Sequence, residues 1–305
     1  MNDYTRDLVA CICRNSKPED VLFYTKKLLD AEKSAKDADF KKRMLEKIEH
    51  TGDKINVPAN CAMFTIAEKY PNINIDRYYL SDREKEVFNK VCVSHKVAKI
   101  LADKGIKGKN SIIFYGESGN GKTTLGRYIA YKLELPFIYL KLSYLTDSLL
   151  GKTQQNLSNV FRFVNGLKCV FMLDEIDAIA AKRGQSNDVS EIGRITISLM
   201  QELDELSSET ILIGATNRID IIDDAVLSRF VEKHELKRFT QDERESYVTT
   251  YLNDVEIPYT EEDVKRICEE SVTQRALENK VIDFISAYFY EDVVNNWEVE
   301  GKEEE

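Results

Sequence analysis

The stretch Ile112-Ile-Phe-Tyr-Gly116-Glu-Ser-Gly-Asn-Gly121-Lys122-Thr123 decides the fold. Its first four residues are apolar and typical of a buried strand, and residues 125–133 continue as a helix. Between them, Gly116 and Gly121 allow the backbone to fold around an anion, with its N–H groups and the helix N-terminus facing the charge. The sequence therefore predicts a phosphate-binding loop, against the alternative of a glycine-rich turn without a ligand.

The side chains of this loop indicate which phosphate compound it binds. Lys122 is expected to reach the β- and γ-phosphates of ATP, and the Thr123 hydroxyl to coordinate Mg²⁺. Gly119 and Thr124 complete the predicted nucleotide-binding set. ATP and Mg²⁺ are thus the predicted cofactors.

Short apolar runs continue along the chain after this loop. They occupy residues 137–140, 169–173 and 211–215, with a shorter segment at 233–236, and helical stretches separate them. Strands that alternate with helices predict an α/β fold with a doubly wound, five-stranded parallel sheet. Ligands of such sheets bind at the carboxyl ends of the strands.

Two adjacent acidic residues, Asp174 and Glu175, follow the third of these apolar runs. At a strand end beside the phosphate loop, Asp174 is expected to hold Mg²⁺, and Glu175 to orient or deprotonate the attacking water. A solvated strand end is the alternative for either acid alone. Asp177 is interpreted as a carboxylate at a helix start.

Composition limits the class of protein. The chain has 305 residues, 43% hydrophobic and 31% charged, and a formal net charge of −10. Affinity for nucleic acid comes from Lys and Arg that neutralise phosphates, so a nucleic-acid partner is not expected. No stretch has the roughly 20 apolar residues of a membrane helix, and the start is unlike a signal peptide, which predicts a cytoplasmic protein. The six cysteines and three histidines have no zinc-ligand spacing.

At this point the residues from about 84 to 290 resemble the ATPase module of the AAA+ superfamily, and its AAA clade in particular. Asn217, which follows residues 210–216, is similar to the family's first sensor and would help to position water at the γ-phosphate. Arg229 resembles the arginine finger that enters a neighbouring subunit's site. The alternatives are a turn-capping Asn and a surface Arg paired with Asp223 or Asp224.

Two further features match the family less completely. Arg275 resembles the second sensor at the γ-phosphate, with an ordinary helix-surface arginine as the alternative. Leu149 and Leu150 lie where related unfoldases have a pore loop, but those enzymes usually have an aromatic residue at the position of Leu149. Packing of the two leucines onto the module is the alternative. Residues 183–190 are a second candidate pore loop or a connection.

The resemblance implies four parts of the chain. They are an N-terminal helical domain at 1–80 for substrate or adaptor binding, a large ATPase subdomain at 81–238, a small helical lid at 239–297 and an acidic tail at 298–305. It also implies a homo-oligomeric ring, most often a hexamer, that remodels or unfolds a protein and in some relatives accompanies a peptidase. A nucleic-acid loader and a nucleotide-gated interaction switch are the alternative functions.

Overall fold

The computed structural model describes Lys27 and residues 55–69, 71, 73–75, 77–146, 152–180 and 189–300. The chain forms two compact units, Met1–Asn56 and Val57–Glu305, and the fold below is that of the second unit. The helices predicted within residues 1–48 lie outside the described residues. The second unit begins at Val57.

One six-stranded sheet with the order β1-β3-β4-β5-β2-β6 forms the centre of the unit. The strands β2 to β6 are mutually parallel, as the sequence predicts, and β1 joins the edge antiparallel to β3. The prediction of five strands therefore missed β1. The strands are β1 (Thr65–Glu68), β2 (Ser111–Tyr115), β3 (Phe137–Lys141), β4 (Val170–Asp174), β5 (Ile211–Thr216) and β6 (Glu232–Glu235).

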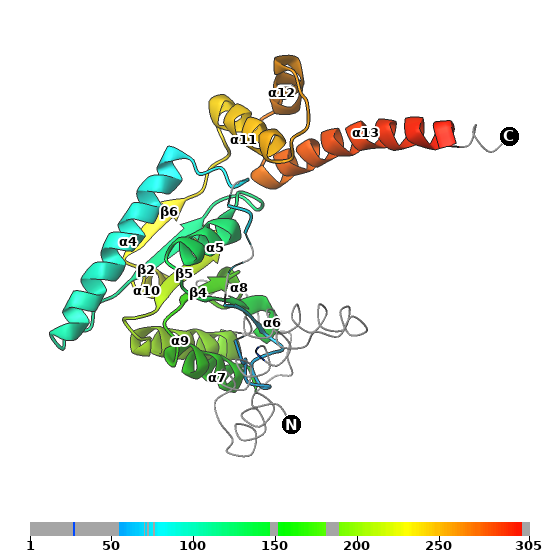
Figure 1. Cartoon of the computed structure of the whole chain (residues 1–305). Helices are drawn as coiled ribbons and strands as arrows, with labels where there is room; N and C mark the ends of the chain where they lie inside the picture. Colours follow the sequence, from blue (N-terminus) through cyan, green and yellow to red (C-terminus); the bar gives the residue numbers. More distant parts are fainter. Residues whose placement is uncertain are drawn as a thin grey trace. The chain divides into compact units, whose positions relative to one another are not determined.

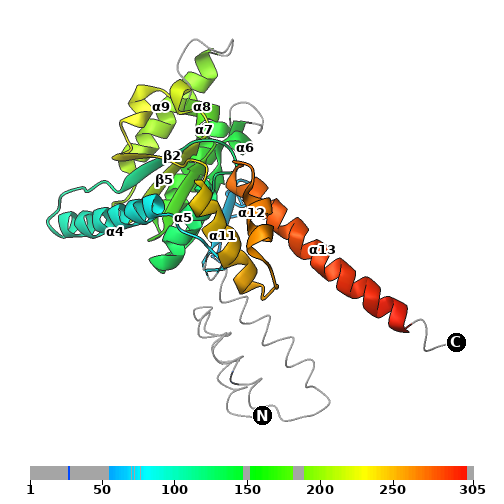
Figure 2. The same ribbon diagram turned by 90° about the horizontal axis from the view of Figure 1, so that it is seen from above.

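Helices connect the strands (Figures 1 and 2). Those that precede or connect them are α4 (Asp82–Asp103), α5 (Lys122–Lys132), α6 (Leu142–Thr146), α7 (Thr153–Asn165), α8 (Asp177–Ala180), α9 (Val189–Glu205), the 3₁₀ turn η2 (Ile219–Ile221) and α10 (Asp224–Leu227). The Ser81 side chain and Glu84 form a capping box at the start of α4, which explains why the helix begins at Asp82. None of the described helices is long and apolar enough to cross a membrane.

The sheet is covered on both faces, because neighbouring residues of β4 pack against different helices. The Phe171 ring meets the ring of Phe161 in α7 edge-on, with 5.2 Å between centroids. Met172 belongs to the cluster that includes Leu125 and Ile129 of α5. Since successive side chains of a strand point to opposite faces, α5 and α7 lie on opposite sides of the sheet. This is the doubly wound arrangement that the sequence predicts.

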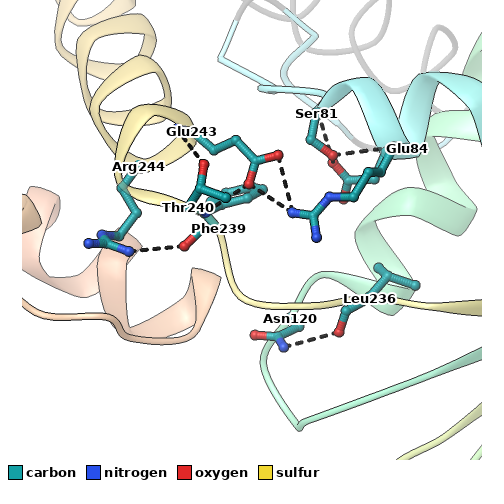
Figure 3. A network of polar contacts seen from close by, with 9 residues as sticks. Ser81, Glu84, Asn120, Leu236, Phe239, Thr240, Glu243 and Arg244 are labelled. Carbon is teal, nitrogen blue, oxygen red and sulfur yellow. Dashed lines mark hydrogen bonds and ion pairs between the residues drawn. The ribbon is translucent and has the colours of Figure 1, made fainter.

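A second hydrophobic cluster lies after Phe239 and joins the three remaining helices. These are α11 (Gln241–Asp254), α12 (Glu261–Cys268) and α13 (Gln274–Glu300), and we call them the lid. Val248, Ile267 and Leu277 contribute one buried side chain from each helix. Figure 3 shows the entry to the lid, where Thr240 and Glu243 form the capping box of α11.

Among the described residues, ion pairs join the lid segment to the rest of this unit. Arg83 of α4 contacts Glu243 of α11 at 2.8 Å, and Arg238 contacts Glu117 at 2.7 Å. Both pairs are partly exposed, so each contributes little stability alone. They place the start of the lid beside the loop that follows β2.

Candidate functional site

The loop from Gly116 to Gly121 connects β2 to α5, as the sequence predicts. Gly116 has φ +132° and Gly121 has φ +78°, conformations that favour glycine. A Cβ at Gly116 would lie 2.4 Å from the Leu236 carbonyl oxygen, so any side chain there would clash with the backbone. The Asn120 side chain also donates to this carbonyl, at 3.2 Å (Figure 3). The loop is therefore held against the end of β6.

Lys122 is the first residue of α5, and its side chain contacts the loop that precedes it. Its Nζ donates to the carbonyl oxygens of Gly116 at 2.8 Å and Glu117 at 3.0 Å, and to Oδ1 of Asn217 at 2.7 Å. Burial lowers the pKa of Lys122, although Asp174 and Asp177 act in the opposite direction. The structure thus brings together Lys122, at the start of α5, and Asn217, which directly follows β5.

Asp174 ends β4 with both carboxylate oxygens in hydrogen bonds. Oδ2 accepts from the hydroxyl of Tyr139 at 2.7 Å, and Oδ1 accepts from the backbone N–H of Glu175 at 2.8 Å. Burial, followed by the hydrogen bond to Asp174, raises the pKa of Tyr139 well above its ordinary value. The Tyr139 hydroxyl therefore stays protonated and fixes the orientation of Asp174.

Glu175 directly follows Asp174 and has a positive φ of 53°. Lys141 lies with its Nζ 2.9 Å from Oε1 of Glu175. Burial raises the pKa of Glu175, but hydrogen bonds with Ser143 and Lys141 outweigh it, and the net pKa is below the ordinary value. The ionised form of Glu175 is thus favoured by Lys141 at the end of β3 and Ser143 in α6.

Tyr139 and Lys141 were not among the residues predicted for the site. In the parallel register, Lys141 lies opposite Asp174 and Tyr139 lies opposite Met172. Both side chains are polar and two residues apart at the carboxyl end of a buried strand, so they lie on one face of the sheet. That spacing was the available signal, but which strand neighbours β4 could not be read from it.

A pocket of about 630 Å³ contains most of the predicted residues, namely Gly119, Gly121, Lys122, Thr123, Thr124, Asp174, Glu175, Asn217 and Arg275. Its volume lies within the usual range for small-molecule sites. The lid contributes Tyr247 and Tyr251, and the segment before α4 contributes Arg77, Tyr78 and Tyr79. The prediction missed these five residues, because nothing in the sequence indicates which side chains of the lid or of the segment before α4 face the loop.

Arg275 and Arg229 occupy different places. The backbone N–H of Arg275 donates to the Gly119 carbonyl at 3.0 Å, and its side chain lines the pocket. Arg229 is not among the lining residues of this pocket. Its guanidinium contacts Asp204 of α9 at 3.0 Å and the Ala225 carbonyl at 2.6 Å. These contacts tie Arg229 to α9 and α10.

Asp177 is the first residue of α8, at a helix start as expected. It accepts a hydrogen bond from the Thr216 hydroxyl at 2.6 Å and so joins α8 to the end of β5. The candidate pore residues Leu149 and Leu150, and the loop 183–190 apart from its last two residues, lie outside the described residues.

Two oxygen donors in the pocket, one hydroxyl and one carboxylate, fit the usual way in which proteins bind Mg²⁺. Among the residues that the structure describes, no group of three or more His, Cys, Asp or Glu side chains could hold a metal alone. Asp174 and Thr123 both line the pocket and offer one carboxylate and one hydroxyl. Mg²⁺ typically binds to one or two protein oxygens together with waters and substrate phosphates, which matches this donor set.

Comparisons with known proteins find similarity to ATPases over the residues that form much of the pocket. The profile of the "ATPase family associated with various cellular activities (AAA)" matches residues 112–238. The peroxisomal ATPase PEX6 of Candida glabrata is 39% identical over 132 residues, covering 42% of this chain and 13% of that protein. PEX6 of Saccharomyces cerevisiae is 34% identical over 167 residues, covering 53% of this chain and 16% of that protein. The chain thus spans only 13% to 16% of the length of these relatives.

Proposed function

Because residues 112–238 form an ATPase module of the AAA family, we propose that this chain hydrolyses ATP in the described pocket to remodel a protein partner. The observation that carries the proposal is the convergence of Lys122, Asn217 and the pair Asp174–Glu175 on one pocket. These groups come from three separate strand ends, which a coincidental glycine-rich turn would not bring together.

The phosphates would lie against the loop that begins at Gly116. Its N–H groups and the N-terminus of α5 offer positive charge, and Lys122 adds a buried ammonium. In the described contacts Lys122 is held by two loop carbonyls and Asn217. Binding of ATP would redirect Nζ from these carbonyls to the β- and γ-phosphate oxygens, with little movement of the backbone.

Thr123 and Asp174 would hold Mg²⁺, which when bound offsets charge on the transferred phosphoryl group. Tyr139 keeps its own proton and donates it to Oδ2 of Asp174, which fixes the orientation of that carboxylate. Glu175 would then orient or deprotonate the attacking water, and Asn217 would position that water beside the γ-phosphate. The lowered pKa of Glu175 keeps it able to accept a proton at neutral pH.

Arg229 would act in the pocket of a neighbouring subunit. Its position away from the pocket of its own chain, in an ion pair with Asp204 that is half-exposed, supports this role. By stabilising the transition state, such an arginine raises kcat roughly 10³- to 10⁵-fold in phosphoryl-transfer systems of this kind. A mixture of Lys122→Ala and Arg229→Ala chains should therefore recover activity that neither variant has alone.

The remodelling role rests on the family and on the relatives, which are named as peroxisomal ATPases. We infer a homo-oligomeric ring, as a hexamer, in which the N-terminal residues 1–80 bind a substrate or adaptor and residues 149–150 contact the polypeptide. A peptidase partner and a cytoplasmic location belong to the same proposal.

A nucleotide-gated switch is the second candidate, and one contact favours it. Lys141 holds Glu175 at 2.9 Å, which restrains the group that would activate water. A switch would hydrolyse ATP slowly until a partner releases this contact. Turnover with and without a candidate partner separates the switch from a continuous motor.

A trapping experiment tests the remodelling proposal. The Glu175→Gln variant should bind ATP, form assemblies stabilised by ATP, and retain a protein substrate in ATP but not in ADP. The Lys122→Ala variant is the matched control that should retain none. A wild-type chain that stays monomeric with ATP and releases no phosphate would contradict the proposal.

A further inference from the structure

The outward face of α4 is apolar. Val93, Val97 and Ile100 are spaced as one helical stripe, and their exposed fractions are 61%, 47% and 56%. The opposite side of the helix carries Val87 and Val91, which are buried in the core beneath it. The helix therefore has a second apolar face that its own sheet does not use. A contiguous exposed apolar surface commonly marks an interaction site.

Positive charge surrounds this stripe. Lys90, Lys96 and Lys104 are exposed and lie within roughly one-sixth of a turn of it, given about 100° per residue in a helix. In the part of the chain that the structure describes, no ion pair joins these three lysines to another residue. Residues 90–109 contain six lysines and one acidic residue, in a chain whose net charge is −10. We call this face, with its three apolar and three basic residues, the α4 stripe.

The end of α13 has the complementary character. Leu277 and Val281 are buried in the lid core, but further along the helix Phe289, Tyr290 and Val293 are 48%, 71% and 58% exposed. Residues 291–305 contain seven acidic residues and one lysine, with Trp297 among them. This segment combines apolar side chains with negative charge, whereas the α4 stripe combines them with positive charge.

We propose that the α4 stripe binds the C-terminal segment, residues 286–305, of a second copy of this chain. The apolar residues of the two helices would pack together, and the lysines of the stripe would face the acids of the segment. Opposite charges around an apolar contact set partner choice and register. The proposal does not require ATP hydrolysis.

A second copy is the required occupant because of the direction of α13. Figures 1 and 2 both show this continuous helix extending past α11 and α12, away from α4 of the same unit. The α4 stripe of the same chain is therefore not the proposed partner of this segment, and a second copy supplies the α4 stripe that it would bind. The two surfaces differ, so the contact is head-to-tail and propagates into a closed ring or an open filament.

Charge reversal provides the test, with sedimentation velocity over a concentration series as the measurement. The stripe variant carries Lys90→Glu, Lys96→Glu and Lys104→Glu, and like charges should weaken its self-association about 10-fold or more. The segment variant carries Glu291→Lys, Asp292→Lys and Glu298→Lys and should behave in the same way. Since all of these residues lie outside the pocket, retained ATP binding reports that each variant is folded.

An equal mixture of the two variants is the decisive sample. Each stripe then meets a segment of opposite charge on the other variant, so association should return to within about 3-fold of the wild type. A control with Lys99→Glu, Lys233→Glu and Lys265→Glu has the same net charge as the stripe variant but leaves the stripe intact, and it should associate like the wild type.

Three results would overturn the proposal. The first is a wild-type chain that stays monomeric at every concentration. The second is a mixture that fails to recover association. The third is a stripe variant that associates normally but loses salt-dependent binding to a single-stranded oligonucleotide, which would identify the stripe as a nucleic-acid surface.

Discussion

The two sides of the pocket differ in how their residues are brought together. On the phosphate side, Gly116, Gly121 and Lys122 lie within seven consecutive residues between β2 and α5. On the carboxylate side, Tyr139 and Lys141 of β3 contact Asp174 and Glu175, which follow more than thirty residues later. The phosphate side is a local motif, whereas the carboxylate side depends on which strands are neighbours. The two sides should therefore respond differently to mutation.

Removal of the ammonium on the phosphate side should have the largest effect. In Lys122→Ala, phosphate release should fall at least about 100-fold, because a buried donor directed at the transferred group is lost. ATP affinity should fall as well, measured by calorimetric titration. Lys132→Ala, in the last turn of the same helix, is the matched control and should retain both. Normal ATP affinity in Lys122→Ala would contradict the assignment.

On the carboxylate side, loss of one hydroxyl should have an intermediate effect. Tyr139→Phe removes the hydrogen bond that orients Asp174, and partners of this kind typically change metal affinity or activity by about 10-fold or more. The Mg²⁺ concentration needed for tight ATP binding should rise, while binding without Mg²⁺ stays unchanged. Tyr131→Phe, on the exposed side of α5, is the control. Equal effects with and without Mg²⁺ would indicate a structural role only.

An ion pair joins the edge strand β1 to α5, the helix on the phosphate side, and should contribute to the stability of the unit. Arg127 donates to both carboxylate oxygens of Glu68 in β1, from Nη2 to Oε1 at 2.9 Å and from Nε to Oε2 at 3.2 Å. Glu68→Ala should lower the free energy of unfolding by about 1 kcal/mol in urea denaturation. Glu232→Ala, on the opposite edge strand β6, should change it by less. A larger loss in Glu232→Ala would show that β1 has no special role.

The smallest expected effect concerns pH. The folded pKa of Glu175 is lowered, so its pair with Lys141 contributes stability above the unfolded glutamate pKa and loses it as pH falls through the folded value. Lys141→Ala should therefore cost roughly 0.5 kcal/mol at pH 7, since the pair is partly exposed. The difference from the wild type should shrink below about pH 4, the range of ordinary glutamates. A difference that is constant with pH would assign the loss to packing.

The same contrast explains what could be predicted from the sequence. The strand predicted at residues 169–173 is a continuous apolar run, and the helix predicted after the glycine loop follows a local motif, so both elements are present, as β4 and α5. The strand β1 is only four residues long and ends in Glu68, so periodicity did not distinguish it. The contact of Arg229 with Asp204 joins residues 25 positions apart through the packing of α9. Contacts of this kind depend on the tertiary arrangement.

The most direct test of Glu175 as the water-activating group is a paired measurement on the Glu175→Gln variant. ATP affinity and single-turnover phosphate release should be measured on the same preparation, with the wild type beside it. We predict an affinity within about 3-fold of the wild type and phosphate release slowed at least about 100-fold, as for loss of a positioned general base. Phosphate release at the wild-type rate would contradict the assignment of Glu175.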